Sequence, residues 1–292
     1  MNCVEAELTV LVDDNAGYVK GILGQHGFSV LVKVKDKTEK CYNILFDVGQ
    51  DSKVLLHNAN LLSINLNNVD SIAFSHRHYD HTGGICTLLK ELGKRLPVVA
   101  HPDIGKPALI IDENKPRVNL NAGLPCSIAE LKKISSLILT RSPLTLAPGV
   151  WWLGEIPRIT SYEKGPRWSY TVSDDGELIR DPMKDDTGMA ISIENYGTIV
   201  ITGCSHSGIV NIITYASKVT GEGVRAIIGG LHLVDADDDV LEKTLNDLHK
   251  LGVKEVYAGH CTGIKAESLL IKSYNDKFNK IYTGYKMLFK VE

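Results

Sequence analysis

Three histidines and one aspartate are gathered within six residues, and their side chains are suited to binding metal ions. They are His76, His78, Asp80 and His81, between Ser75 and Gly84. Imidazole nitrogens and a carboxylate suit zinc, manganese or iron. Four such groups at H-x-H-x-D-H spacing are too many for one open catalytic site, so the spacing predicts two ions side by side. A polar surface loop that is merely rich in histidine is the competing interpretation, but adjacent histidines gain nothing there unless a metal or an acid satisfies them.

The elements around this cluster place it at the end of a strand. Residues 69–74 read as a short buried strand, and the segment from Gly84 to Leu92 reads as a helix. The same order, an apolar strand followed by glycine and histidine, recurs at His206, His232 and His260. Strand ends along one sheet edge can converge even when they are distant in sequence. We therefore expect about six ligands around two ions, a site that can clamp the attacking and leaving oxygens of a phosphoryl or acyl substrate.

The rest of the chain consists of two strand-rich halves, each of which also supplies helices. Strands are predicted at 8–12, 28–34, 42–46, 97–100, 149–153, 189–193, 198–202, 224–228, 255–258 and 285–291, and helices at 52–62, 209–218, about 240–249 and 265–279. This pattern favours an α/β (α+β) four-layer αββα sandwich over a doubly wound parallel sheet, which needs more regular strand–helix alternation. We expect one domain over residues 1–292, with an inserted lid at about 101–185.

Composition and charge narrow the class of partner. The chain has 292 residues, 43% of them apolar, and a formal net charge of −3, which gives no electrostatic reason to bind nucleic acid. No signal peptide is visible, and no apolar run approaches the roughly 18 residues that span a membrane. The six cysteines are scattered without C-x-x-C pairs, which favours reduced thiols. We expect a cytoplasmic protein with a small-molecule partner, and the number of subunits, a homo-oligomer included, stays open.

On these residues the chain resembles the metallo-β-lactamase superfamily, whose signature is H-x-H-x-D-H. The resemblance implies two divalent cations, zinc first and manganese or iron as alternatives. It implies that His76 and His78 bind the first, and that Asp80, His81 and His260 bind the second. Asp47, at the end of its strand, matches an aspartate that supports the ligand loop in the superfamily. Without the resemblance, Asp47 reads equally well as a plain turn residue.

The second half of the site departs from the superfamily pattern. An aspartate usually follows Thr-Gly at a strand end, but Cys204 stands there, with His206 two residues later. Either His206 replaces the superfamily's third histidine, or Asp186 and Cys204 fill the two missing positions and His206 lies outside the ligands. We favour His206 as a ligand, because an imidazole on such a loop is otherwise hard to satisfy. Cys204 as a small buried apolar residue is the competing interpretation.

His232 resembles a histidine with which some superfamily phosphodiesterases protonate the leaving group, so we take Asp80 and His232 as the catalytic residues. An ordinary strand-end histidine is the competing interpretation of His232.

Four sequence segments indicate which branch of the superfamily the chain resembles: Gly203–Asn211, Ile228–Leu233, Gly259–Gly263 and Gly154–Arg158. They resemble the branch that contains the archaeal dihydropterin–ribofuranosylaminobenzene 5′-phosphate synthases, which release diphosphate in methanopterin biosynthesis.

Many other members of that branch are generic metal-dependent hydrolases. The resemblance therefore implies a phosphorylated small molecule more securely than a pterin, and a hydrolase of phosphodiesters or lactones is the alternative. A di-iron redox protein ranks lower, because no flavodoxin-like extension exists, and a non-catalytic binding module is disfavoured by the complete signature. In the insertion, Arg158, Lys164, Arg167 and Lys184 are candidates for phosphate binding, and Trp151, Trp152 and Trp168 for stacking. Ordinary solvated charge and local packing are the competing interpretation for each of them.

Overall fold

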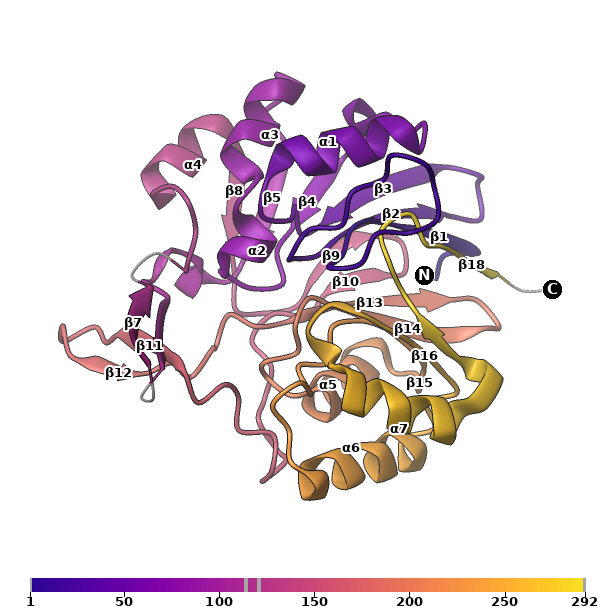
Figure 1. The fold of residues 1–292 in the computed structure, drawn as a ribbon. Coiled ribbons are helices and arrows are strands. Elements are labelled where there is room, and N and C mark those ends of the chain that lie inside the picture. The colour runs from indigo at the N-terminus through magenta and orange to yellow at the C-terminus, as the bar shows by residue number, and fades with distance from the viewer. Residues whose placement is uncertain (1, 113–114, 120–121, 291–292) are drawn as a thin grey trace.

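Two seven-stranded sheets form the centre of the computed structural model, which describes residues 2–112, 115–119 and 122–290 (Figure 1). In spatial order, the first sheet contains β18 (Lys286–Lys290), β1 (Glu5–Val12), β2 (Ser29–Lys35), β3 (Cys41–Phe46), β4 (Ser71–Ala73), β5 (Pro97–Ala100) and β8 (Ser136–Leu139). The second contains β17 (Phe278–Lys280), β16 (Glu255–Ala258), β15 (Val224–Gly229), β14 (Gly197–Thr202), β13 (Gly188–Ile193), β10 (Val150–Trp152) and β9 (Leu144–Ala147).

Helices cover the outer face of each sheet. The first sheet is covered by α1 (Ser52–Leu61), α3 (Ile85–Leu92) and α4 (Ile128–Ile134), and the second by α5 (Ile209–Thr220), α6 (Asp238–Lys250) and α7 (Ile264–Tyr274), as Figure 1 shows. The short helix α2 (Tyr79–Thr82) lies beside the site described below. The four layers confirm the predicted αββα sandwich.

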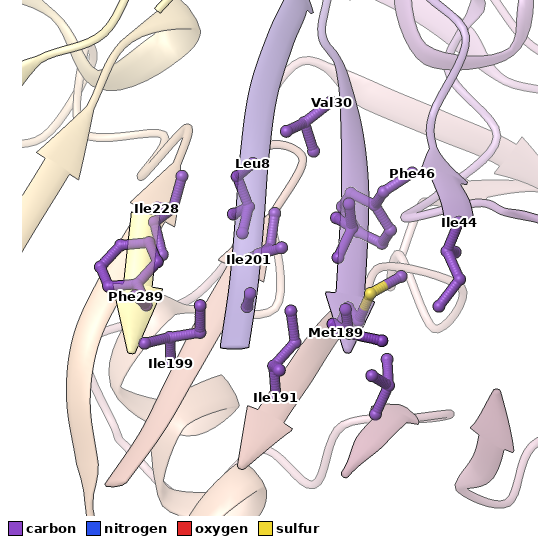
Figure 2. Close-up of a cluster of buried hydrophobic side chains, with 14 of the residues drawn as sticks. Leu8, Val30, Ile44, Phe46, Met189, Ile191, Ile199, Ile201, Ile228 and Phe289 are labelled. Atoms are coloured by element: carbon purple, nitrogen blue, oxygen red, sulfur yellow. The ribbon is translucent and has the colours of Figure 1, made fainter. Parts of the chain in front are cut away.

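The core between the sheets explains why the central strands are apolar on both faces. Figure 2 shows Leu8, Val30 and Phe46 of the first sheet facing Met189, Ile191 and Ile201 of the second, and all of them are buried. Leu11 and Leu45 point the other way and pack with α1 and α3. Because both faces are covered, these strands do not show the apolar–polar alternation of a half-exposed sheet.

The predicted insertion at 101–185 divides between the main sheets and a small sheet of its own. Its α4 and β8 belong to the first half of the sandwich, and β9 and β10 extend the second sheet. The remainder forms a four-stranded sheet with β12 (Leu178–Arg180), β11 (Ser169–Val172), β6 (Leu109–Asp112) and β7 (Lys115–Asn119) in spatial order. It stands to one side of the sandwich, at the left of Figure 1.

Two sequence expectations are wrong. The last helix, predicted to run to residue 279, ends at Tyr274 because Asn275 takes a positive φ of 51°, and residues 278–280 form β17 beside β16. Cys86 and Cys126 form a disulfide that joins α3 to the segment before α4, against the expectation of reduced thiols throughout. Within the described part of the chain, no helix is both long and apolar enough to cross a membrane.

Candidate metal centre

The polar strand ends of both sheets meet at one edge of the sandwich. Asp47 follows β3, the histidine cluster follows β4, and Cys204, His232 and His260 follow β14, β15 and β16. Several of these residues take a positive φ that is rare for non-glycine residues, among them Asp47 (57°), His232 (44°) and His260 (47°). Such backbone conformations cost free energy and occur often at functional sites. The loops are therefore shaped to present these side chains.

One group at this edge consists of three imidazole rings. The ring centres of His76 and His78 are 4.6 Å apart, and each lies within 4.9 Å of the ring centre of His206. All three side chains are buried. Neither ring nitrogen of His206, nor Nε2 of His78, has a hydrogen-bond partner among the described residues. Buried polar atoms without partners are rare because they are costly, so this group is suited to a ligand that supplies the missing contacts.

A second group consists of a carboxylate and two imidazoles. Oδ2 of Asp80 lies 3.2 Å from Nε2 of His81 and 3.4 Å from Nε2 of His260. The side chain of Asp80 is 7% exposed, and those of the two histidines are fully buried. Three donor atoms of the types that bind zinc therefore point to one place.

Cys204 lies between the two groups. Its Sγ atom is 3.2 Å from Nε2 of His81 and 3.2 Å from Nε2 of His260. The same sulfur lies within 4.8 Å of a ring nitrogen of His76 and of His206. The sulfur of Cys204 is therefore close to the donor atoms of both groups.

Two buried carboxylates hold these loops in place. Asp47 accepts hydrogen bonds from the backbone N–H of Ser75 (2.7 Å) and from Nδ1 of His81 (2.7 Å), which turns Nε2 of His81 toward Cys204. Asp186 accepts from the N–H (2.8 Å) and the hydroxyl (2.6 Å) of Ser207, next to His206. Its other oxygen, Oδ1, is buried, has no hydrogen-bond partner among the described residues and lies 3.9 Å from Nδ1 of His76.

A buried ion-pair network ties the first loop to the segment before β13. The Arg77 guanidinium pairs with Asp181 and Asp185, and its backbone N–H donates to Asp185 at 2.8 Å. The side chains of all three are at most 2% exposed. The residue between the first two histidines of the motif is therefore structural, and it fixes their loop against the neighbouring segment.

Burial and neighbouring histidines keep the first group neutral. Burial, followed by the charges of the other histidines, holds the pKa of His76 and His206 well below its usual range. Burial lowers the pKa of His78 to about 3. Neutral imidazole is the form that binds metals.

The carboxylates beside His81 have the opposite effect on its pKa. Burial opposes charge on His81, but Asp80 and Asp47 outweigh it and raise the pKa of His81 to about 9. Burial raises the pKa of Asp186 to about 6.

His232, Cys261 and Trp168 border the first group. The ring of His232 lies 4.2 Å from that of His206, and both of its ring nitrogens are buried without partners among the described residues. The Trp168 indole, in the turn just before β11, lies 5.9 to 6.2 Å from the rings of His78, His206 and His232. Sulfur of Cys261 lies within 4.8 Å of Cys204 and His232. The small sheet therefore places an aromatic ring against this group.

Two other candidates from the insertion, Arg158 and Trp152, make structural contacts. Arg158 donates to the backbone carbonyls of Pro182, Met183 and His206, so its guanidinium holds two loops together. Trp152 is fully buried in the core and donates to the carbonyl of Phe74, which excludes it from stacking on a ligand. These contacts depend on the packing of distant segments, which local sequence does not reveal.

Asp14 and His26 contact side chains of the second group, although the sequence predicted a role for neither. Asp14, just after β1, accepts from Nδ1 of His260 at 2.7 Å, and His26 lies 3.5 Å from Oδ2 of Asp80. The signal for Asp14 was present, since Asp13 and Asp14 follow an apolar strand as the ligand candidates do. His26 follows no strand and carries no such signal.

The residues present fit a pair of divalent cations. Imidazole, carboxylate and thiolate are the donors that zinc takes in proteins. The partnerless nitrogens of His78 and His206 and the partnerless oxygen of Asp186 are polar atoms that cations would satisfy. Asp47 behind His81 and Asp14 behind His260 form the carboxylate–histidine pairs that typically orient metal-binding imidazoles.

Comparison with known proteins identifies relatives along the whole chain. Residues 42–133 match the family model described as "Beta-lactamase superfamily domain". The chain is 37% identical, over 95% of its length and 95% of the relative's, to the 7,8-dihydropterin-6-methyl-4-(beta-D-ribofuranosyl)-aminobenzene-5'-phosphate synthase of Methanocaldococcus jannaschii. An uncharacterized protein of the same organism is 32% identical over 92% of this chain and 95% of its own.

The fold also matches a solved structure closely. The crystal structure of Tm1679, described as a metal-dependent hydrolase of the beta-lactamase superfamily, has a TM-score of 0.80 and 28% identity. The match covers 97% of this chain and 98% of the other.

Proposed function

Because this chain belongs to the metallo-β-lactamase superfamily, in the branch of the archaeal dihydropterin–ribofuranosylaminobenzene phosphate synthase, we propose that it is a two-metal enzyme acting on a phosphorylated small molecule. The observation that carries this proposal is the shared position of Cys204 between two groups of buried ligand atoms. Donor atoms of both groups lie within 4.8 Å of this one sulfur, so two cations held by the groups would be neighbours.

The proposed ligands follow from these groups. His76, His78 and His206 would hold one cation, and Asp80, His81 and His260 would hold the other, with the sulfur of Cys204 within 4.8 Å of donor atoms of both groups. Bound divalent cations, zinc first among them, supply Lewis-acid stabilisation of the charge that develops on a phosphate or diphosphate. Asp186 and Asp47 hold the ligand loops from behind. This assignment favours His206 over Asp186 as the third ligand of the first group.

His232 is the proposed proton donor to the leaving group. Its imidazole lies beside His206, and within the described part of the chain neither ring nitrogen has a hydrogen-bond partner, so one of them could deliver a proton to a leaving oxygen. Asp80, the other proposed catalytic residue, would hold the second cation together with His81 and His260. Trp168 and the small sheet act as a lid that limits the access of water to the reacting phosphate.

The substrate proposed first is that of the related synthase. In this proposal the chain joins a dihydropterin diphosphate to an aminobenzene ribosyl phosphate and releases diphosphate, in the cytoplasm. The 37% identity over 95% of both chains supports this choice. The second candidate is a hydrolase, because the structure with a TM-score of 0.80 is described as a metal-dependent hydrolase.

One experiment separates the candidates. The zinc-loaded protein is incubated with both synthase substrates, and in parallel with phosphodiesters and lactones, while coupled product, diphosphate and hydrolysis are measured. Coupled product with release of diphosphate supports the synthase. Cleavage of diesters or lactones without coupled product rules out the synthase and supports the hydrolase. A purified protein that binds no divalent cation contradicts both.

A further inference from the structure

The loop between β1 and β2, residues 13–28, carries a carboxylate that contacts two imidazoles at once. Oδ1 of Asp14 accepts from Nδ1 of His260 at 2.7 Å, and Oδ2 of Asp14 lies 3.0 Å from Nδ1 of His26. A ring whose Nδ1 is engaged presents its Nε2 on the opposite side. Both Nε2 atoms accordingly face Asp80, at 3.4 Å from Oδ2 for His260 and 3.5 Å for His26.

The loop is held against Asp80 by contacts that do not involve His26. The N–H of Phe28 donates to the backbone carbonyl of Asp80 at 3.2 Å, and the N–H of Gly27 donates to Asp14 at 3.1 Å. Gly27 has a φ of 130°, and a Cβ there would lie 2.1 Å from the Asp80 carbonyl oxygen. Only glycine allows this approach. A change at the His26 side chain therefore leaves the loop in position.

His26 is open to solvent, unlike the proposed ligands. Its side chain is 53% exposed, whereas that of Asp80 is 7% exposed. The His26 imidazole links Asp14 to Asp80, and of these three side chains it is the most exposed to solvent. His26 is absent from the hydrophobic core clusters, and its ring lies 6.2 Å from the ring of Tyr79 and 5.3 Å from that of His260. Its contacts are therefore with Asp14, Asp80 and the residues beside the second group.

We propose that His26 is a positioning residue of the second cation site, which together with Asp14 fixes the orientation of the Asp80 carboxylate. The inference rests on the proposed role of Asp80 as a ligand. Groups that contact a metal ligand without binding the ion themselves typically change metal affinity by 10- to 100-fold when they are removed. His26 reaches Asp80 from the β1–β2 loop, a part of the chain outside all the ligand motifs.

The test measures zinc affinity of the full-length protein by competition with a chelating indicator, for the wild type, His26→Ala, His26→Gln and His57→Ala. His57, on α1, contacts the same loop through the carbonyl of Gly21 at 2.8 Å but lies outside the site, so it is the matched control. The absorption spectrum of the cobalt-loaded proteins reports the ligand geometry independently of activity.

We expect His26→Ala to bind one of two zinc ions about 10- to 100-fold more weakly and to change the cobalt spectrum. The variant His26→Gln should recover part of the affinity, because its amide N–H can donate to Asp80, and His57→Ala should match the wild type. The inference about His26 is overturned if His26→Ala and His57→Ala lose the same zinc affinity, or if His26→Ala binds both zinc ions as tightly as the wild type. Either result leaves the proposed function standing. A wild-type protein that binds no zinc overturns the proposed function as well.

Discussion

The sulfur of Cys204 lies 3.2 Å from Nε2 of His260, although the two residues are 56 positions apart and come from the ends of two strands that are not neighbours. β15 separates β14 from β16, so the contact requires both loops to bend across the edge of the sheet. This contact brings the second ligand group to the sulfur that the first group also faces.

Replacing Cys204 by alanine should reduce zinc binding at both groups, because its sulfur is the atom they share. We expect a loss of more than about 100-fold in affinity, since outer groups alone account for 10- to 100-fold. The variant Cys204→Asp should retain two zinc ions, because a carboxylate can fill the same position. Metal content after dialysis against a chelator measures both effects.

The control for this prediction is Cys41→Ala, since Cys41 is an exposed free thiol away from the site. Loss of only one zinc ion from Cys204→Ala would contradict a shared position. If Cys204→Ala keeps both zinc ions, Cys204 is a small buried apolar residue and not a ligand.

Arg77→Ala should destabilise the fold. The substitution leaves the carboxylates of Asp181 and Asp185 buried without their cation, and breaking a buried pair in this way typically costs about 3–5 kcal/mol. Urea unfolding of the zinc-free protein measures the loss in the free energy of unfolding. Arg141→Ala is the matched comparison, because its side chain is 60% exposed while it also pairs with two carboxylates, those of Asp103 and Glu155. A change below about 1 kcal/mol in Arg77→Ala would contradict a structural role for this network.

The local sequence predicts the candidate ligand residues, but it does not predict the contacts that fix their side chains in place. His206, His232 and His260 could be predicted because each follows an apolar strand and a glycine, and strand ends share an edge. Arg158 and His26 could not be assigned correctly, because their contacts are with backbone and side chains far away in sequence. The Cys86–Cys126 disulfide spans 40 residues, and nothing in the spacing of the cysteines indicates it. The lid role of residues 101–185 stays a prediction.

Glu163 should make stability depend on pH. Burial raises the pKa of this carboxyl, although it accepts hydrogen bonds from the N–H groups of Val210 (2.9 Å) and Asn211 (3.0 Å) in the first turn of α5. An acid with a raised pKa in the folded state binds more protons there than in the unfolded state. Its contribution to stability is therefore greatest below its ordinary pKa and declines as pH rises through the raised value.

The measurement is the free energy of unfolding of the zinc-free protein as a function of pH, for the wild type and for Glu163→Gln. The free energy of unfolding of the wild type should fall relative to that of Glu163→Gln as pH rises from the ordinary to the raised pKa of Glu163. Above the raised pKa, the difference between the two proteins should stay constant. A difference that moves in favour of the wild type with rising pH would mean that the hydrogen bonds from α5 outweigh burial.

Trp168→Ala should weaken substrate binding without removing metal. The indole lies against the rings of His78, His206 and His232, but it is not among the proposed ligand atoms. Loss of an aromatic contact of about 0.5–1.5 kcal/mol corresponds to a rise in KM of roughly 2- to 13-fold. Trp151→Phe, in β10, is the matched control. Zinc content of Trp168→Ala should equal that of the wild type, and cobalt loading should quench the emission of Trp168 more strongly than that of the other two tryptophans. A normal KM with lost zinc would instead make Trp168 a support of the metal ligands.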